Sequence, residues 1–200
     1  EQIKINNKTL SEYHFSLKDF HLKSPTGFTE YNGEYHLFYN HSQNKKENDA
    51  QVWGHSVSKD LINWKKLNSA IAPFESYDNK GLLGGTALEN DGMLYLIYTG
   101  ISQQENIDEN SPPTTNLTET INVATSKDGF YFGKSANNPV IKLTTKHTHL
   151  PLTKDYAKTP YVWKENDYFF ALIGSQYKET QDGTLLLFKS QDLKNWDYVG

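Results

Sequence analysis

The sequence predicts an all-β protein of the β-propeller type, and two sets of repeated segments carry this prediction. The first set has the pattern Ser-x-Asp followed by a turn and an aromatic residue, and its copies are 58–64 (SKDLINW), 126–132 (SKDGFYF) and 190–196 (SQDLKNW). A Ser or Asp side chain in such a position accepts hydrogen bonds from backbone amides about two residues further on, and the aromatic ring packs between sheets. These segments are therefore expected to close hairpins and to have a structural role.

The second set marks the tight turns between strands. Each copy is a turn dipeptide followed by a run of aromatic and aliphatic residues, and the three copies are Asn32-Gly33 before 34–39, Asp91-Gly92 before 93–98, and Asn166-Asp167 before 168–173. This combination is typical of a β-hairpin. The chain is therefore expected to consist of hairpins throughout.

The Ser-x-Asp segments begin 68 and 64 residues apart. A repeated block of short strands with this length fits a four-stranded propeller blade better than a sandwich, whose strands do not recur as a block. We expect blades at approximately 13–66, 67–133 and 134–200, in one domain or a fragment of one, because 200 residues bury a single sizeable core. The polar segment 101–120 is expected to be an exposed loop.

Composition excludes several classes of function. The net charge is -4 and the pI is about 6.0, so neither nucleic acid nor an anionic membrane surface is an expected partner. All 20 basic residues are Lys, which leaves any phosphate recognition to lysine side chains. The chain has no Cys, hence no disulfide and no thiolate nucleophile. No apolar stretch reaches the roughly 18 residues of a membrane span, and residues 1–10 do not form a signal peptide.

Residues 15–43 (FSLKDFHLKSPTGFTEYNGEYHLFYNHSQ) and 52–64 (VWGHSVSKDLINW) are similar to the opening of glycoside hydrolase family 32, which includes invertases, levanases, inulinases and sucrose-6-phosphate hydrolases. The resemblance extends from about Tyr13 to Trp196 and includes 138–141 (NPVI). It implies a five-bladed propeller, of which this chain supplies about three blades. The others would belong to a longer protein, to a second chain or to a self-associated copy, because an open stack exposes sheet faces and strand edges.

The resemblance also implies which residues should perform catalysis, and here the sequence departs from the family. Where the family has an Asp nucleophile in Asn-Asp-Pro-Asn-Gly, residues 23–27 read KSPTG and place Ser24. Where it has the Asp of Arg-Asp-Pro, Lys158 is followed by Thr159. Retaining glycosidases need two carboxyl groups about 5 to 5.5 Å apart. Ser24 has no evident base to activate its neutral hydroxyl, since His21 is expected on the opposite strand face.

The residues that would line the sugar site are also implied by the resemblance. The Phe-Tyr-Gln of the family becomes 38–40 (FYN), so Asn40 keeps an amide with a shorter reach. Trp53 is retained as a possible platform for a sugar ring, although packing is an equally good expectation for it. The Phe-Ser-Gly of the family becomes 83–85 (LGG). The expected substrate-binding residues are therefore Ser24, Asn40, Trp53, Gly84, Lys158 and Thr159.

These observations lead to the hypothesis of a catalytically degenerate propeller that holds a fructose-containing carbohydrate or a partner protein. The alternative is an active β-fructofuranosidase or sucrose-6-phosphate hydrolase that uses a displaced carboxylate, such as Asp19, Asp49 or Asp78, or a site completed by a second chain. A third alternative is a remnant without a ligand. No cofactor and no metal are expected, because His147 and His149 lack a third ligand at a recognisable spacing.

Overall fold

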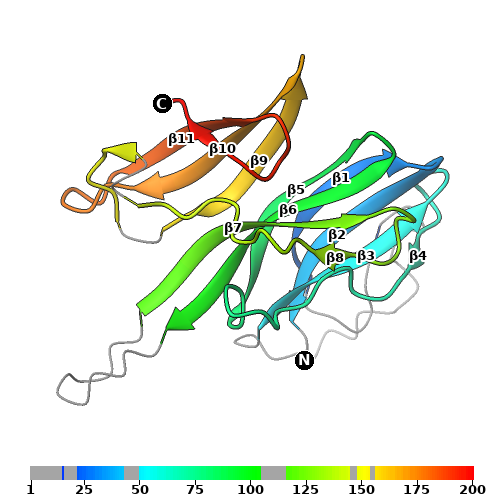
Figure 1. Ribbon diagram of the computed structural model, residues 1–200. Helices are drawn as coiled ribbons and strands as arrows, with labels where there is room; N and C mark the ends of the chain where they lie inside the picture. Colours follow the sequence, from blue (N-terminus) through cyan, green and yellow to red (C-terminus); the bar gives the residue numbers. More distant parts are fainter. Residues whose placement is uncertain (1–14, 16–21, 43–49, 105–115, 145–147, 154–155) are drawn as a thin grey trace, which may run out of the picture.

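The computed structural model describes residue 15 and residues 22–42, 50–104, 116–144, 148–153 and 156–200. These residues form three antiparallel sheets of four strands, in the orders β1-β2-β3-β4, β5-β6-β7-β8 and β12-β11-β10-β9. Each sheet is a propeller blade, and Figure 1 shows the three blades side by side with their first strands, β1, β5 and β9, toward the middle of the molecule. The prediction of an all-β propeller is confirmed.

The strands of each blade follow one another along the chain. Blade 1 contains β1 (Leu22–Tyr31), β2 (Glu34–Ser42), β3 (Gln51–Ser58) and β4 (Lys65–Lys66). Blade 2 contains β5 (Gly81–Asn90), β6 (Met93–Gln104), β7 (Asn116–Ser126) and β8 (Gly133–Lys134). Blade 3 contains β9 (Lys158–Glu165), β10 (Tyr168–Gln176), β11 (Gly183–Ser190) and β12 (Asp197–Tyr198).

The tight turns lie where the dipeptides predict them. Asn32, Asp91 and Asn166 all have positive φ values, of 52°, 51° and 54°. Gly33 and Gly92 follow the first two with φ values of 76° and 69°. Two consecutive residues with positive φ form the turn whose twist matches that of paired strands, and Asn, Asp and Gly adopt this conformation at the least cost.

The Ser-x-Asp segments close the outer hairpin of each blade by the expected hydrogen bonds. In blade 3, the Ser190 hydroxyl accepts from the amide of Leu193 at 3.0 Å, and Asp192 Oδ1 accepts from the amides of Lys194 and Asn195, both at 2.8 Å. The same contacts recur around Asp60 and Asp128. These backbone amides lower the pKa of all three carboxyl groups, and that of Asp192 falls to about 2 although its partial burial acts in the opposite direction.

The loop prediction for 101–120 is too wide. Strand β6 continues to Gln104, and β7 begins at Asn116, so that Ile101 pairs with Glu119 and Gln103 with Leu117. Polar residues such as Thr118 and Thr120 occupy strand positions here because the hairpin ladder satisfies their backbone groups, whatever their side chains. Within the segment 101–120, residues 105–115 lie outside the described residues.

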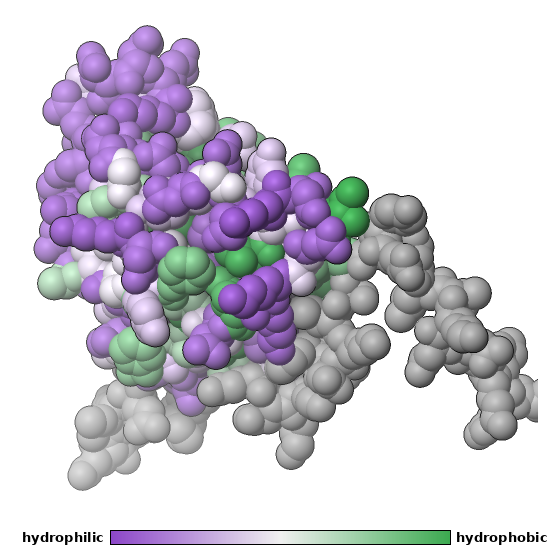
Figure 2. Space-filling view, turned by 90° about the vertical axis from the view of Figure 1, so that its right-hand side faces the viewer, coloured by the Kyte–Doolittle hydropathy of each residue, from purple (hydrophilic) through white to green (hydrophobic). Residues whose placement is uncertain are grey.

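Two apolar clusters fill the seams between blades. One contains Phe38, Trp53, Leu96 and Tyr98 and joins blades 1 and 2, and the other contains Ile97, Ile121, Val162 and Phe169 and joins blades 2 and 3. The face shown in Figure 2 is mostly hydrophilic, with apolar residues in small groups. In the part of the chain that the structure describes, no helix has the length and apolarity required to cross a membrane.

The glycine of the second Ser-x-Asp segment offers a test of the seam between blades 1 and 2. A methyl group at Gly129 would lie 2.8 Å from His36 Cε1 and 3.1 Å from the Tyr31 ring, and the φ of Gly129 is 79°. Gly33 has nearly the same φ, 76°, with nothing within 4 Å of such a methyl group. Gly33→Ala should cost about 1 kcal/mol for backbone conformation alone. Gly129→Ala should cost about 1–3 kcal/mol more because of the overpacking.

The free energies of unfolding of the two variants, measured by denaturant titration, check this prediction. Equal losses of unfolding free energy in the two variants would mean that the residues between blades 1 and 2 move to accommodate the added methyl group.

Candidate functional site

The inner strands of the three blades run side by side, and their contacts place the site residues at one level. A methyl group at Gly27 of β1 would lie 2.8 Å from Ala87 Cβ of β5. The Thr86 hydroxyl of β5 donates to Pro160 O at 2.9 Å and accepts from the Val162 amide at 3.0 Å, both in β9. Neighbouring strands in this register carry Ser24, Gly84 and Thr159 at the same end.

Gly84 and Thr159 are in direct contact. A methyl group at Gly84 would lie 2.9 Å from Thr159 Cγ2, so that the absence of a side chain at Gly84 makes room for Thr159. Thr159 is exposed and has a φ of 31°. A β-branched residue rarely adopts positive φ, and strained positions of this kind gather at functional sites.

Ser24, Asn40 and Trp53 form a row across blade 1. Ser24 pairs with Asn40 between β1 and β2, and Asn40 pairs with Trp53 between β2 and β3. Ser24 is exposed, whereas Asn40 is only 5% exposed and its side-chain oxygen has no hydrogen-bond partner among the described residues. The hydroxyl of Thr26, which the sequence did not point to, is also buried and has no partner within the described part of the chain. Unpaired buried polar atoms are costly and call for an explanation such as a ligand or a water.

Trp53 is part of the core. Its side chain is 0% exposed, it packs against Phe38 and Tyr98, and its Nε1 donates to Leu83 O at 2.7 Å. Its only polar group is thus satisfied within the protein. Of the two expectations for Trp53, the structure shows packing; the ring offers no surface to a sugar in this conformation.

Lys158 and Glu119 form an ion pair beside Thr159. Lys158 Nζ contacts Glu119 Oε1, and it lies 4.7 Å from the centre of the Tyr156 ring. Glu119 is 8% exposed. Sequence analysis missed Glu119 because it lies in the polar segment that was predicted to be a loop. No alternation of polar and apolar residues marks it as a strand residue, because Thr118, Glu119 and Thr120 are all polar and all buried, and its pairing partner Ile101 lies in another strand.

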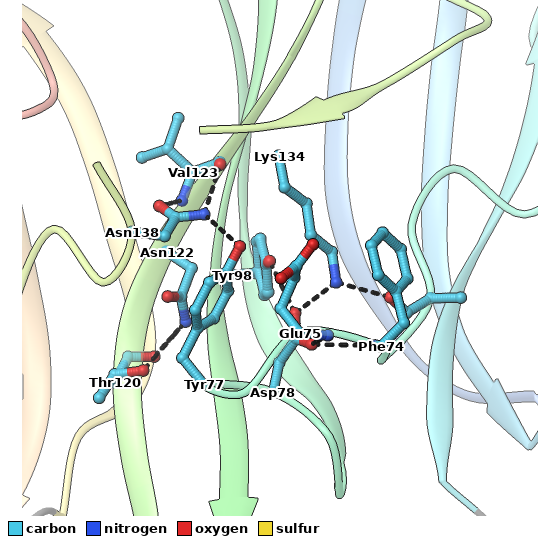
Figure 3. Close-up of polar contacts among 11 residues, drawn as sticks. Phe74, Glu75, Tyr77, Asp78, Tyr98, Thr120, Asn122, Val123, Lys134 and Asn138 are labelled. Carbon is cyan, nitrogen blue, oxygen red and sulfur yellow. Dashed lines mark hydrogen bonds and ion pairs between the residues drawn. The ribbon is translucent and has the colours of Figure 1, made fainter. Parts of the chain in front are cut away.

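Asp78, one of the candidate displaced carboxylates, is fully engaged in a buried network (Figure 3). It accepts from Lys134 Nζ at 2.5 Å and from the Tyr98 hydroxyl at 3.0 Å through Oδ2, and from the amides of Phe74 and Glu75 through Oδ1. Burial and the nearby Asp78 raise the pKa of Tyr98, so this hydroxyl stays a donor. Asp78 therefore fixes the loop before β5 and is not free to attack a substrate. The other two candidates, Asp19 and Asp49, lie outside the described residues.

In the described ranges, no group of three or more His, Asp or Glu side chains is arranged to hold a metal ion. His147 lies outside the described residues, and His149 is exposed. The chemistry at the ends of the inner strands is thus that of hydroxyl groups, an amide and one lysine–carboxylate pair.

The fold defines a β-propeller whose inner strands carry Ser24, Gly84 and Thr159 at one end. Residues 14–200 match the model of the glycosyl hydrolases family 32 N-terminal domain, and the chain belongs to this family.

Curated relatives agree with this assignment. The chain is 34% identical over 181 residues to the sucrose-6-phosphate hydrolase of Zymomonas mobilis. This alignment covers 89% of this chain and 33% of that protein. It is 31% identical over 179 residues to the enzyme of the same name from Bacillus subtilis, with 90% and 34% covered. The chain spans about a third of the length of these relatives.

Solved structures with the same fold include a sucrose-6-phosphate hydrolase from Lactobacillus gasseri, with a TM-score of 0.74 and 28% identity. That match covers 94% of this chain and 36% of the other. A β-fructofuranosidase from Bombyx mori has a TM-score of 0.72 and 29% identity, with 90% and 36% covered.

Proposed function

We propose that this chain is a unit of three propeller blades, at about 13–66, 67–133 and 134–200, that binds a fructose-containing carbohydrate without hydrolysing it. The observation that carries the proposal is the chemistry at the ends of β1 and β9. Ser24 and Thr159 occupy the two positions where the resemblance to the family implies carboxylates. A neutral hydroxyl can neither form the glycosyl intermediate nor stabilise an oxocarbenium-like transition state as a carboxylate does.

The position of Asp78 supports the loss of hydrolysis. All of its hydrogen-bonding capacity is used by Lys134, Tyr98 and two backbone amides, so it cannot replace a missing nucleophile. The pseudoenzyme interpretation is thereby preferred to an active β-fructofuranosidase with Asp78 as a displaced carboxylate.

Retention of a sugar ligand is supported by the polar atoms left without partners. The side-chain oxygens of Asn40 and Thr26 are both buried and have no partner in the described ranges, and both lie near the exposed Ser24. A carbohydrate hydroxyl would supply the donor that these oxygens lack. The names of the relatives give the class of sugar, because they describe hydrolases of sucrose 6-phosphate and of β-fructofuranosides.

The test combines an activity assay with a binding assay on the purified chain. We expect no release of reducing sugar from sucrose, sucrose 6-phosphate, inulin or levan, and calorimetric binding of at least one of them. Ser24→Trp should abolish the binding heat by filling the end of β1, whereas Ser69→Trp, at an exposed position after β4, should preserve it.

Either of two results would overturn the proposal. Turnover that survives Ser24→Ala would show that a carboxylate elsewhere, in this chain or a second one, acts as the nucleophile. Failure to bind any of the four sugars would indicate a propeller remnant without a carbohydrate ligand.

A further inference from the structure

The second Ser-x-Asp turn, 126–132, belongs to blade 2 but packs against blade 1. The Tyr31 hydroxyl of β1 donates to Lys127 O of the turn at 2.6 Å. A methyl group at Gly129 of the turn would lie 2.8 Å from His36 Cε1 of β2. Contacts this close leave no space between the turn and blade 1, so the turn closes this part of the seam between the two blades.

The turn covers a pair of buried histidines. His36 is 2% exposed and His55 is 0% exposed, and His36 Nδ1 lies 2.9 Å from His55 Nε2. The centre of the Phe130 ring lies 6.4 Å from that of the His36 ring. The centre of the Phe132 ring lies 6.0 Å from that of the His55 ring, and Phe38 stacks on His55 at 4.4 Å. The two imidazoles are thus enclosed by aromatic rings, two of which come from the turn.

The hydrogen bonds of the pair leave no acceptor for an additional proton. His36 donates to the backbone carbonyl of Tyr31, and because Nδ1 of His36 faces His55, the donating atom is Nε2. A neutral His36 then accepts at Nδ1 from His55 Nε2, so His55 Nδ1 carries no proton. This Nδ1 is buried and has no hydrogen-bond partner in the described ranges. A proton on it would be a buried charge without an acceptor, and the closed seam therefore favours the neutral pair.

The turn can separate from blade 1 while its own blade stays folded. Strand β8, which follows the turn, pairs with β7 at two positions, and its Lys134 is anchored by the ion pair with Asp78. The side chains of Ser126 and Asp128 bond amides of the same turn, so these hydrogen bonds can move with it. Separation therefore breaks mainly the contacts between the turn and blade 1.

We propose that turn 126–132 is an acid-released latch, which leaves blade 1 when the His36–His55 pair takes up protons while the rest of the propeller stays folded. Burial lowers the pKa of both histidines in the closed state, whereas a histidine in contact with water takes up a proton near pH 6.5. The released state thus binds more protons than the closed state, and its population increases as the pH falls below about 6.5. The latch is independent of the proposed carbohydrate binding.

Other titratable side chains belong to the elements around the pair. They are Tyr31 in β1, Glu34 in β2, Lys65 and Lys66 in β4, Asp91 in the hairpin that Tyr31 contacts, and Lys127 and Asp128 in the turn. Glu34 favours the charged form of His36 and so acts against burial. The backbone amides of the turn lower the pKa of Asp128, so this carboxylate stays charged between pH 7 and pH 5.5. In that range the histidines themselves supply the pH response.

NMR relaxation dispersion, which detects exchange with a minor state on the microsecond to millisecond timescale, tests the latch at pH 7 and pH 5.5. Turn 190–196 is the internal control, because it has the same Ser and Asp hydrogen bonds and, among the described residues, no ring contact with a histidine. The released population of 126–132 should rise about tenfold over this range for each histidine that takes up a proton on release. The amides of 190–196 should show no such rise.

Three variants connect the exchange to the histidine pair. His55→Gln keeps a donor opposite His36 but does not titrate, so the tenfold rise due to His55 should disappear. His149→Asn replaces an exposed histidine and should keep the full rise. Gly129→Ala crowds His36, so it should increase the released population at both pH values and keep the rise between them.

Any of four results would overturn the inference. They are no rise at 126–132, an equal rise at 190–196, an unchanged rise in His55→Gln, and exchange with one common population throughout the chain, which would mean that acid promotes only global unfolding. If His55→Gln does not fold, the comparison of the two turns in the unaltered chain and in Gly129→Ala still decides.

Discussion

Asp78→Asn should destabilise the protein by about 3–5 kcal/mol, a large part of the total stability of a typical domain. Asp78 is 0% exposed, and its partner Lys134 has a side chain that is only 5% exposed. The substitution leaves the ammonium of Lys134 buried without a carboxylate, beside a neutral amide, Ala72 O at 2.7 Å and the rings of Phe74 and Tyr77. None of these neutral groups balances a positive charge.

Denaturant titration of three further variants checks the cause of this loss. Asp78→Asn combined with Lys134→Met should recover part of the stability, because the uncompensated charge is gone. Asp91→Asn is the matched control: Asp91 is exposed and has a positive φ that Asn tolerates, so its replacement should change stability little. A double variant less stable than Asp78→Asn alone would show that the hydrogen bonds to the 74–75 loop, and not the buried ammonium, set the cost.

Acidification from pH 6.5 should remove about 3–5 kcal/mol of stability before pH 3 is reached, because of a buried histidine pair. His36 Nδ1 and His55 Nε2 are 2.9 Å apart, and both rings are buried in the seam between blades 1 and 2. Burial, together with the charge that His36 would carry, lowers the pKa of His55 to about 3. Burial also lowers the pKa of His36, with Glu34 acting in the opposite direction.

The direction of the pH effect follows from proton binding. The unfolded chain protonates His55 near pH 6.5, whereas the folded chain protonates it only near pH 3. In this window the unfolded state binds more protons, so the contribution of His55 to stability is complete above about pH 6.5 and is lost as the pH falls. One hydrogen bond between two imidazoles also requires one of the facing nitrogens to lack a proton, which a doubly charged pair cannot satisfy.

Unfolding free energies between pH 7 and pH 4 test this effect. The double variant His36→Asn, His55→Asn should have a flatter pH dependence than the unaltered chain, and His149→Asn, which replaces an exposed histidine with positive φ, should keep the original slope. Titration of the His55 ring by NMR with a midpoint near 6.5 in the folded protein would contradict the prediction.

The hairpins and blade turns could be predicted because their determinants are local. Asn32-Gly33 and Asp91-Gly92 adopt positive φ at little cost, and Ser190 and Asp192 bond amides within three residues of themselves. These interactions depend little on the rest of the fold, so the sequence pattern is sufficient. The prediction of a loop at 101–120 was wrong at both ends of this segment, because strand pairing, a non-local interaction, forms strands from polar residues there.

The resemblance to the family selects Ser24, Gly84 and Thr159 as site residues, and their functional role stays a prediction. The register of the inner strands brings the three residues to one end. The burial of Trp53 and the full engagement of Asp78 did not follow, because each depends on partners 30 or more residues away, such as Leu83 and Lys134. The position of a residue in the sequence does not determine which face of a blade packs against the next blade.

The sequence by itself determined the all-β propeller, its family and the absence of carboxylates at positions 24 and 159, since repeat spacing and residue identity are properties of the chain alone. Only the tertiary structure decided which charges are paired. Both carboxylate oxygens of Asp78 accept hydrogen bonds, whereas Oε2 of Glu119, in the ion pair with Lys158, has no hydrogen-bond partner among the residues that the structure describes. The physical reason is that burial and pairing arise where blades pack, between residues that are distant in sequence and that no local pattern relates.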